Sequence, residues 1–218
     1  MYREFTPQEV AKLTPFVMSA EYKALRSSGE TVHYLAYQTA RFLGDEQPYW
    51  LLLMASWEAK NVDPLGTRAR RYNEEFVEAA KSAPVDATAL ESVALRFRAA
   101  NALRELGRFE DAEAMRAAIV IAPTAGGTDE EAAANRDAWS DLVARLADPI
   151  VRRTDTRTPI DMLGEREAVS RCLSKEAAER FEEPVPPPLS AFEEAYCARP
   201  ELADQIKEQR AWLIDSEE

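Results

Sequence analysis

Apolar residues recur along this chain at intervals of three and four, the spacing that places them on one face of an α-helix. No stretch alternates between apolar and polar, and Ala, Glu, Arg and Leu are abundant while β-branched residues are sparse. We therefore predict an all-α fold of stacked antiparallel helical hairpins. Thr6-Pro7 and Thr14-Pro15 each place a cap residue before a proline at the first position of a helix. The predicted helices lie at residues 15–28, 30–43, 46 onward, 64–82, 87–106, 109–119, 129–150, 159–173, 174–183 and 200–213.

The helix predicted from residue 46 differs from the others because it is apolar on almost every side. Residues 49–54 are apolar without a break and Trp57 follows them, and six consecutive residues of a helix cannot all lie on one face. A helix of this kind is contacted by neighbours on several sides, so we expect it to be the deepest helix of the fold.

Residues 99–115 predict a helix, a tight glycine turn at Gly107 and a second helix that packs back on the first. The wider stretch 96–123 resembles one unit of the tetratricopeptide repeat, a paired-helix module. The matching positions are Ala100, Leu103, Gly107, Phe109, Ala112 and Pro123.

The resemblance has limits within the same stretch. Arg96 and Arg116 stand where aromatic residues are usual, and Pro123 comes one residue early. A weak second unit is centred on Gly44, 63 positions before Gly107. The resemblance implies a helical-repeat surface that binds a protein or peptide, and a generic helical bundle stays open as the alternative.

The helices and breaks predict three regions. Residues 1–153 form a helical-hairpin body, and residues 154–183 add helices packed on that body. Residues 184–218 begin with the sequence Pro-Val-Pro-Pro-Pro, which cannot be helical and suggests an extended spacer before an acidic helical tail. The pattern leaves open whether this tail packs on its own chain or on another, and whether the chain is a homodimer.

The formal charge of −12 is unevenly distributed, because residues 129–218 carry −10 of it. Phosphate backbones repel such a chain, so we expect no nucleic-acid partner, whereas a basic protein partner is compatible with the charge. No apolar run approaches the roughly 20 residues of a membrane span. The N-terminal residues show no secretion signal, and we expect a cytoplasmic protein without membrane contact.

The two cysteines, Cys172 and Cys197, are too few for a disulfide framework. No second thiol or histidine is near either of them in sequence, and we expect idle or buried thiols in a reducing compartment.

Two groups of residues are candidates for binding. His33 is the only histidine, and helical spacing places it on one face with Tyr37 and Arg41, where the three side chains are suited to an anion or a proton transfer. The second group is the basic cluster Arg68, Arg70, Arg71 and Tyr72, whose guanidinium groups suit carboxylates or phosphates. The competing interpretations are a surface histidine and ion pairs with Glu74, Glu75 and Glu78 on the same helix.

Catalytic and cofactor motifs are missing from the sequence. It contains no phosphate-binding glycine-rich loop, nucleophile elbow, metal-binding histidine pair or dinucleotide fingerprint. Glu130, Asp137 and Asp141 lack the tight spacing of a calcium loop and suggest a solvated helix face. We therefore expect no catalytic residues, no metal and no cofactor.

Three functions remain after these considerations. The favoured one is a non-catalytic adaptor that binds a protein or peptide on a helical-repeat surface. An acidic immunity or inhibitor protein that neutralises a basic toxin or nuclease is the first alternative. A small-ligand-binding protein or enzyme that uses His33, Tyr37 and Arg41 is the second.

Overall fold

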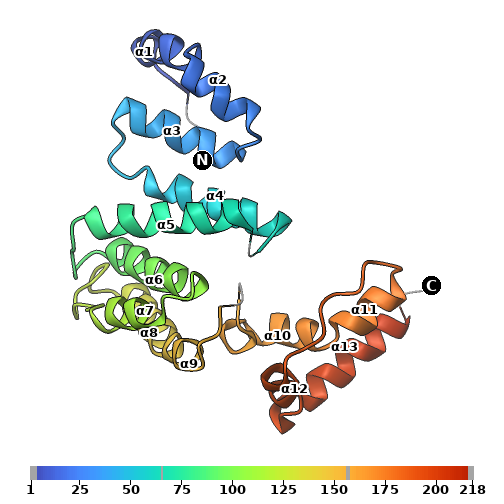
Figure 1. Cartoon of the computed structure of the whole chain (residues 1–218). Coiled ribbons are helices and arrows are strands. Elements are labelled where there is room, and N and C mark those ends of the chain that lie inside the picture. Colours follow the sequence, from blue (N-terminus) through green and yellow to red (C-terminus); the bar gives the residue numbers. More distant parts are fainter. Residues whose placement is uncertain (1–3, 65, 156–157, 216–218) are drawn as a thin grey trace. The chain divides into compact units, whose positions relative to one another are not determined.

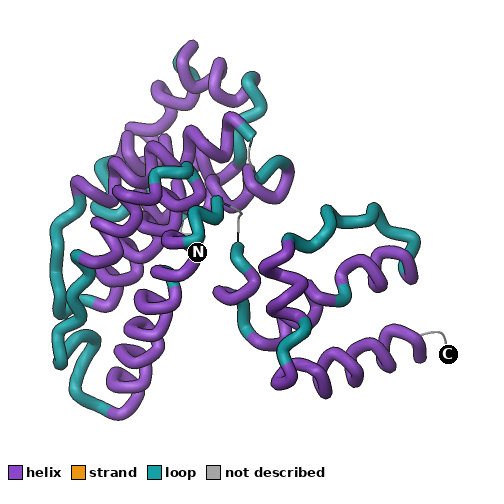
Figure 2. Tube along the Cα trace, turned by 60° about the horizontal axis from the view of Figure 1, so that its bottom comes forward, coloured by secondary structure: helices purple, strands orange, loops and turns teal. Residues whose placement is uncertain are grey.

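The computed structural model describes residues 4–64, 66–155 and 158–215, and no strand occurs among them (Figure 2). The helices are joined by turns and loops, which confirms the all-α prediction. The chain divides into two compact units, residues 1–157 (unit 1) and residues 158–218 (unit 2). Within the described residues, no helix is long and apolar enough to cross a membrane.

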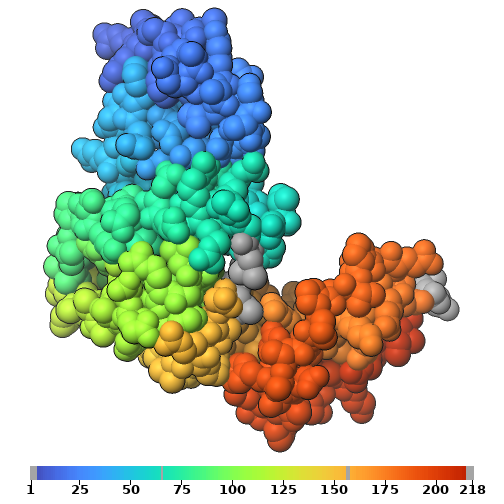
Figure 3. Space-filling view, in the orientation of Figure 1, coloured from blue at the N-terminus to red at the C-terminus, as the bar shows by residue number. Residues whose placement is uncertain are grey.

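Unit 1 is a stack of helices in which α3 to α6 each pack on the next helix in the chain, while α7 packs on α9 and α8 packs on α6 and α9 (Figure 1). In the space-filling view, side chains fill the spaces between the successive helices of this unit (Figure 3). The helices are α1 (Pro7–Val17), α2 (Ala20–Ser27), α3 (Val32–Leu43), α4 (Tyr49–Val62), α5 (Thr67–Ser82), α6 (Leu90–Glu105), α7 (Phe109–Ala117), α8 (Glu130–Arg145) and α9 (Ala147–Val151).

Both predicted glycine turns are present. Gly44 ends α3 with a φ of 84°, and Gly107 has a φ of 75° between α6 and α7. Side chains are disfavoured in this left-handed region, so glycine is the natural residue at both turns. Where α6 and α7 cross, Ala100, Leu103 and Ala112 are buried.

The predicted helix bounds differ from the structure at several points. Of the two predicted starts, the one at Thr6-Pro7 is confirmed, because Thr6 forms a capping box with Glu9 and opens α1. The single helix predicted over residues 15–28 is wrong, since Pro15 lies inside α1 and Ser19 caps a separate α2. Residue 65, expected in the helix 64–82, lies outside the described residues, and α5 begins at Thr67. The prediction that neighbours cover α4 on almost every side is only partly met, since Met54 and Trp57 remain 38% and 40% exposed.

A buried polar network joins α4, α5 and α6 inside unit 1. Glu105 of α6 accepts hydrogen bonds from Lys60 of α4, from Asn73 Nδ2 of α5 at 3.0 Å and from Asn101 Nδ2 at 3.1 Å. Ser56 of α4 donates to Asn73 Oδ1 at 2.6 Å. The Lys60 and Glu105 side chains are only 4% and 7% exposed. A buried charge without a partner is costly, so this network fixes how the three helices sit on one another.

Arg104 extends this network toward the end of unit 1. Its side chain is fully buried, and its Nε donates to Asn101 Oδ1 at 3.0 Å. Its Nη1 donates to the carbonyl oxygen of Thr154 at 2.5 Å. The segment after α9 is thereby attached to α6, and Thr154 belongs to unit 1.

Unit 2 has a small core of its own. Val169, Leu173, Leu202 and Leu213 are buried together, and Ala177, Tyr196 and Ile206 pack against them. The elements are η1 (Ile160–Met162), α10 (Glu165–Cys172), α11 (Ser174–Arg180), α12 (Ala191–Cys197), η2 (Pro200–Leu202) and α13 (Ala203–Asp215).

The boundaries in this half of the chain differ from the three predicted regions. The structure divides the chain after residue 157, whereas the sequence suggested divisions after residues 153 and 183. The proline-rich segment 184–188 is non-helical, as predicted. It connects α11 to α12 inside unit 2, because α10 packs with both α12 and α13.

The prediction of idle thiols is wrong, because Cys172 and Cys197 form a disulfide. These residues are 25 positions apart, and the packing of α10 with α12 brings their ends together. Spacing along the sequence does not show this proximity. The cysteines therefore give no support to a reducing compartment.

Candidate binding pocket

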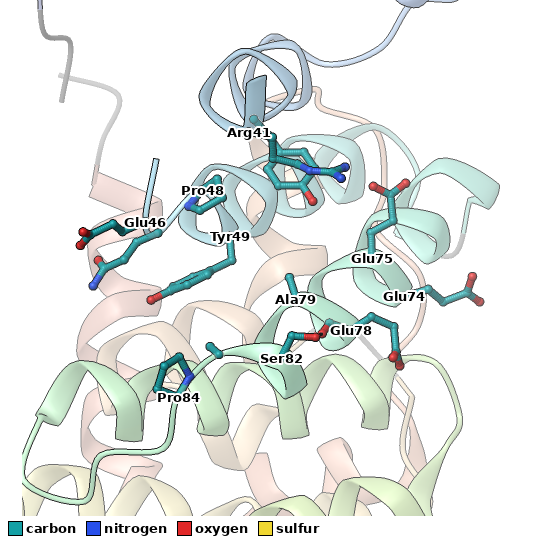
Figure 4. A pocket seen from close by; sticks show the side chains of 13 residues that line it. Arg41, Glu46, Pro48, Tyr49, Glu74, Glu75, Glu78, Ala79, Ser82 and Pro84 are labelled. Carbon is teal, nitrogen blue, oxygen red and sulfur yellow. Dashed lines mark hydrogen bonds between the residues drawn. The ribbon is translucent and has the colours of Figure 1, made fainter. Parts of the chain in front are cut away.

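A pocket of about 930 Å³ lies between α3 and α5 in unit 1. The second half of α3, the loop before α4, the later part of α5 and the residues after it form its wall (Figure 4). Aromatic rings, prolines and carboxylates line it together. The lining residues are Tyr37, Arg41, Glu46, Gln47, Pro48, Tyr49, Glu74, Glu75, Glu78, Ala79, Ser82, Ala83 and Pro84.

Next to the pocket, two stacked tyrosine rings and an arginine join α3 to α5. The rings of Tyr34 and Tyr72 stack with centroids 4.4 Å apart, and the Arg71 guanidinium lies 5.1 Å and 5.0 Å from these centroids. Glu30, which lies just before α3, accepts a hydrogen bond from Arg71 Nη2 at 2.5 Å and another from the Tyr72 hydroxyl. We call these four residues the arginine clamp.

The ionisation of the clamp is set by these contacts. Burial opposes ionisation of Glu30, but its hydrogen bonds from Arg71 and Tyr72 outweigh burial and lower the pKa of this carboxyl. The hydrogen bond to Glu30 raises the pKa of Arg71. Burial, together with the carboxylate of Glu75, raises the pKa of the Tyr34 phenol well above its usual range. The guanidinium therefore stays charged beside an ionised carboxylate and two neutral phenols.

Glu75 connects the clamp with the pocket. Its carboxylate accepts a hydrogen bond from the Tyr34 hydroxyl at 3.0 Å, and its Oε1 lies 3.7 Å from Arg71 Nε. The same side chain lines the pocket and lies on the same side of it as the guanidinium of Arg41 (Figure 4). Tyr37 forms the neighbouring wall; it is 5% exposed, and burial raises its pKa.

The pocket carries more negative than positive charge. Four glutamates line it, with Arg41 as the single cation among the lining residues. Arg41 is exposed and lies over the Tyr37 ring at 5.4 Å from its centroid. Glu78 pairs with Lys81 at 2.9 Å, whereas Glu46 and Glu74 form no ion pair with any described residue. The open side of the pocket is thus acidic.

The structure separates the predicted trio of His33, Tyr37 and Arg41. The Nδ1 atom of His33 lies 3.0 Å from Glu58 Oε2 of α4, and its backbone N–H donates to the same oxygen at 3.3 Å. Burial opposes ionisation of Glu58, but these bonds outweigh it and lower its pKa. His33 is therefore engaged between α3 and α4, while Tyr37 and Arg41 line the pocket.

The predicted basic cluster is also divided. Arg71 and Tyr72 bind Glu30 in the clamp, so their polar groups already have a partner within the chain. Arg68 Nη2 donates to the carbonyl oxygen of Ser28 at 3.4 Å, and Arg70 is exposed without a polar partner among the described residues. Of the ion pairs expected along the helix, the one between Arg71 and Glu75 is present.

Sequence reasoning missed the pocket itself. Glu46 and Pro48 come from the turn before α4, Tyr49 is the first residue of α4, and Glu75 and Glu78 come from α5, about 30 positions later. The one available signal was the repeated glutamate on α5, which was interpreted only as a partner for arginines of the same helix.

Among the described residues, no group of three or more His, Cys, Asp or Glu side chains is placed to hold a metal ion. Glu130, Asp137 and Asp141 lie exposed on α8. In comparisons with known proteins, no protein-family model, no curated protein and no solved structure matches this chain.

Proposed function

We propose that this chain is a non-catalytic interaction protein that binds a segment of a partner polypeptide in the pocket between α3 and α5. The observation that carries the proposal is the pocket itself. Its volume of about 930 Å³ is within the range of ligand sites. Rings and prolines supply apolar contact area, and carboxylates supply fixed polar partners, a combination that suits the mixed surface of a peptide.

The stacked arrangement of unit 1 supports the same proposal. Helical-repeat proteins pack each helix pair on the next and use the resulting extended surface for binding. We propose that the hairpin of α6 and α7 is a tetratricopeptide-like unit, supported by the burial of Ala100, Leu103 and Ala112 and by the left-handed Gly107. The hairpin of α3 and α4 around Gly44 would be the second, divergent unit.

The first alternative, an acidic inhibitor of a basic toxin or nuclease, stays a prediction. Residues 158–218 contain fifteen acidic and seven basic residues, so most of the excess charge lies in unit 2. The pocket lies in unit 1, and for this reason the adaptor is the function that the geometry favours.

Selection from a random peptide library on the immobilised full-length chain tests the proposal. Peptides that are enriched are labelled with fluorescein, and their affinity is measured by fluorescence anisotropy. Ala79→Trp places a large ring in the pocket and should weaken binding at least tenfold. Ala134→Trp makes the same substitution at an exposed position of α8 and should leave the affinity unchanged. If no peptide is enriched, or if the Ala79→Trp protein binds as well as the wild type, the proposal is wrong.

A further inference from the structure

We propose that the pocket between α3 and α5 recognises an arginine side chain of the partner segment. This inference rests on the proposed function and adds the chemistry of the group that is recognised. The inference follows from a comparison of two neighbouring sites along α3 and α5. The first is the arginine clamp, which an arginine of this chain occupies, and the second is the open pocket.

The occupied place is the arginine clamp, and it shows how these helices hold a guanidinium. Arg71 lies over the stacked rings of Tyr34 and Tyr72 at about 5 Å from both centroids, and Glu30 accepts its Nη2 hydrogen bond. Aromatic faces attract a cation, and a carboxylate matches the donor geometry of a guanidinium. The clamp therefore contains both interactions that bind arginine specifically.

The open place contains the same kinds of groups further along the helices. Tyr37 follows Tyr34 by three positions on α3, and Glu75 and Glu78 follow Tyr72 by three and six positions on α5. Residues three or four positions apart lie on one helix face, so the pocket continues the surface that forms the clamp. Tyr49 supplies a second ring, and Figure 4 shows it beside Pro48 and Glu46 at the start of α4.

The charge of the pocket matches a cationic occupant. Its lining has four carboxylates for one guanidinium, and Glu46 and Glu74 have no ion pair among the described residues. Arg41 is exposed at the pocket and lies over the Tyr37 ring, the position that an incoming guanidinium would take. We infer that Arg41 competes with the partner's arginine for this ring and these carboxylates.

Arginine suits this arrangement better than lysine. A guanidinium is planar, stacks on aromatic rings and donates several hydrogen bonds in one plane, whereas an ammonium is a compact and strongly hydrated charge. The clamp uses a guanidinium against the same pair of residue types, tyrosine and glutamate. The partner segment is therefore expected to present arginine next to apolar residues that contact Pro48 and Pro84.

The test uses the peptides selected on the full-length chain, synthesised with arginine, with lysine or with citrulline, the neutral analogue of arginine. Citrulline should weaken binding at least tenfold, and lysine should weaken it less. In the triple variant Glu46→Gln, Glu74→Gln and Glu78→Gln, the arginine and citrulline peptides should bind within twofold of each other. The matched control neutralises three exposed acids of α8, Glu131→Gln, Asp137→Asn and Asp141→Asn, and should keep the preference for arginine.

Arg41→Gln is an independent test, because it should strengthen peptide binding, whereas the glutamate substitutions should weaken it. Removal of the competing guanidinium should strengthen binding of the arginine peptide about threefold or more, whereas a pocket for an anionic group would lose affinity. Circular dichroism confirms that each variant keeps its helices.

The outcomes separate this inference from the proposed function. If Ala79→Trp blocks the selected peptides but citrulline binds as well as arginine, or if Arg41→Gln weakens binding, the arginine site is refuted and the interaction function stands. If no peptide is enriched at all, the proposed function is refuted, and the arginine site with it.

Discussion

Substitution of Lys60 by methionine is the sharpest test of what stabilises unit 1. Lys60 and Glu105 form a buried ion pair between α4 and α6, and their side chains are 4% and 7% exposed. Methionine retains most of the aliphatic volume but removes the charge. Glu105 would lose the ammonium of Lys60 but keep its hydrogen bonds from Asn73 and Asn101 and the buried guanidinium of Arg104, whose Nη2 lies 3.6 Å from Glu105 Oε1.

The expected loss follows from this burial. Removal of one partner of a buried pair typically destabilises by about 3–5 kcal/mol, because the other charge stays in a medium of low polarity. The two amides and the remaining guanidinium of Arg104 compensate part of that loss, so we expect a destabilisation at the lower end of this range, about 3 kcal/mol. Lys81→Met is the matched control: it removes the partner of Glu78 from an exposed pair three residues apart, which should cost less than about 1 kcal/mol.

Urea unfolding followed by tryptophan fluorescence measures both losses. Of the four tryptophans, Trp212 alone lies in unit 2, so a Trp212→Phe background makes the signal specific for unit 1. The double variant Lys60→Met and Glu105→Gln should recover at least half of the lost stability, because glutamine is neutral. If Lys60→Met costs no more than Lys81→Met, or if the double variant is less stable than Lys60→Met alone, the reasoning about this network is refuted.

Three further outcomes are expected. Cys172 and Cys197 are 25 positions apart, so reduction of their disulfide should destabilise unit 2 by about 3.5 kcal/mol through the entropy of the released loop. Fluorescence of Trp212 should show a lower urea midpoint for unit 2, while unit 1 keeps its midpoint. An unchanged midpoint for unit 2 would contradict this prediction. Gly107→Ala should lower the free energy of unfolding by about 1 kcal/mol, because φ is 75° at this position. Thermal unfolding measures this loss, and an unchanged melting temperature would contradict it. The pKa of Glu30 is lower in the folded chain than in the unfolded chain. Its contribution to the stability of the fold is therefore fully present above the pKa of the unfolded chain and is lost as pH falls through the pKa of the folded chain. Glu30→Gln should therefore destabilise at pH 7 and approach the wild type in acid, and a difference independent of pH contradicts this.

The fold was predictable to the extent that it depends on local periodicity. The spacing of apolar residues identified most helices of unit 1, and the glycines at 44 and 107 marked turns that only a left-handed residue fits easily. Bounds were less predictable where two start signals compete: Thr6-Pro7 and Thr14-Pro15 carry the same signal, but only Thr6 caps a helix, and Pro15 lies inside α1. Solvent exposure of Met54 and Trp57 was not predictable, because it depends on which faces of α4 meet a neighbour.

The candidate site was predictable only in its parts. The arginines and tyrosine on α5 stood out in the sequence, but the partner of Arg71 and Tyr72 is Glu30, about 40 positions away. Likewise, His33 binds Glu58 of the next helix, and the two cysteines meet through packing of α10 with α12. In each case the residue type was visible in the sequence, while the partner was decided by tertiary packing.

The consecutive packing of unit 1 has a mechanical consequence. Helices that contact mainly their neighbours in the chain should detach one after another when the protein is stretched, and should re-form without long-range searches. The bridge from Lys60 to Glu105 interrupts this order, because it skips over α5 and ties α4 to α6. The hydrogen bond from Tyr34 of α3 to Glu75 of α5 likewise passes over α4. Under tension from the N-terminus, α1 and α2 are therefore expected to detach first, and α3 to α6 to resist and then unfold together.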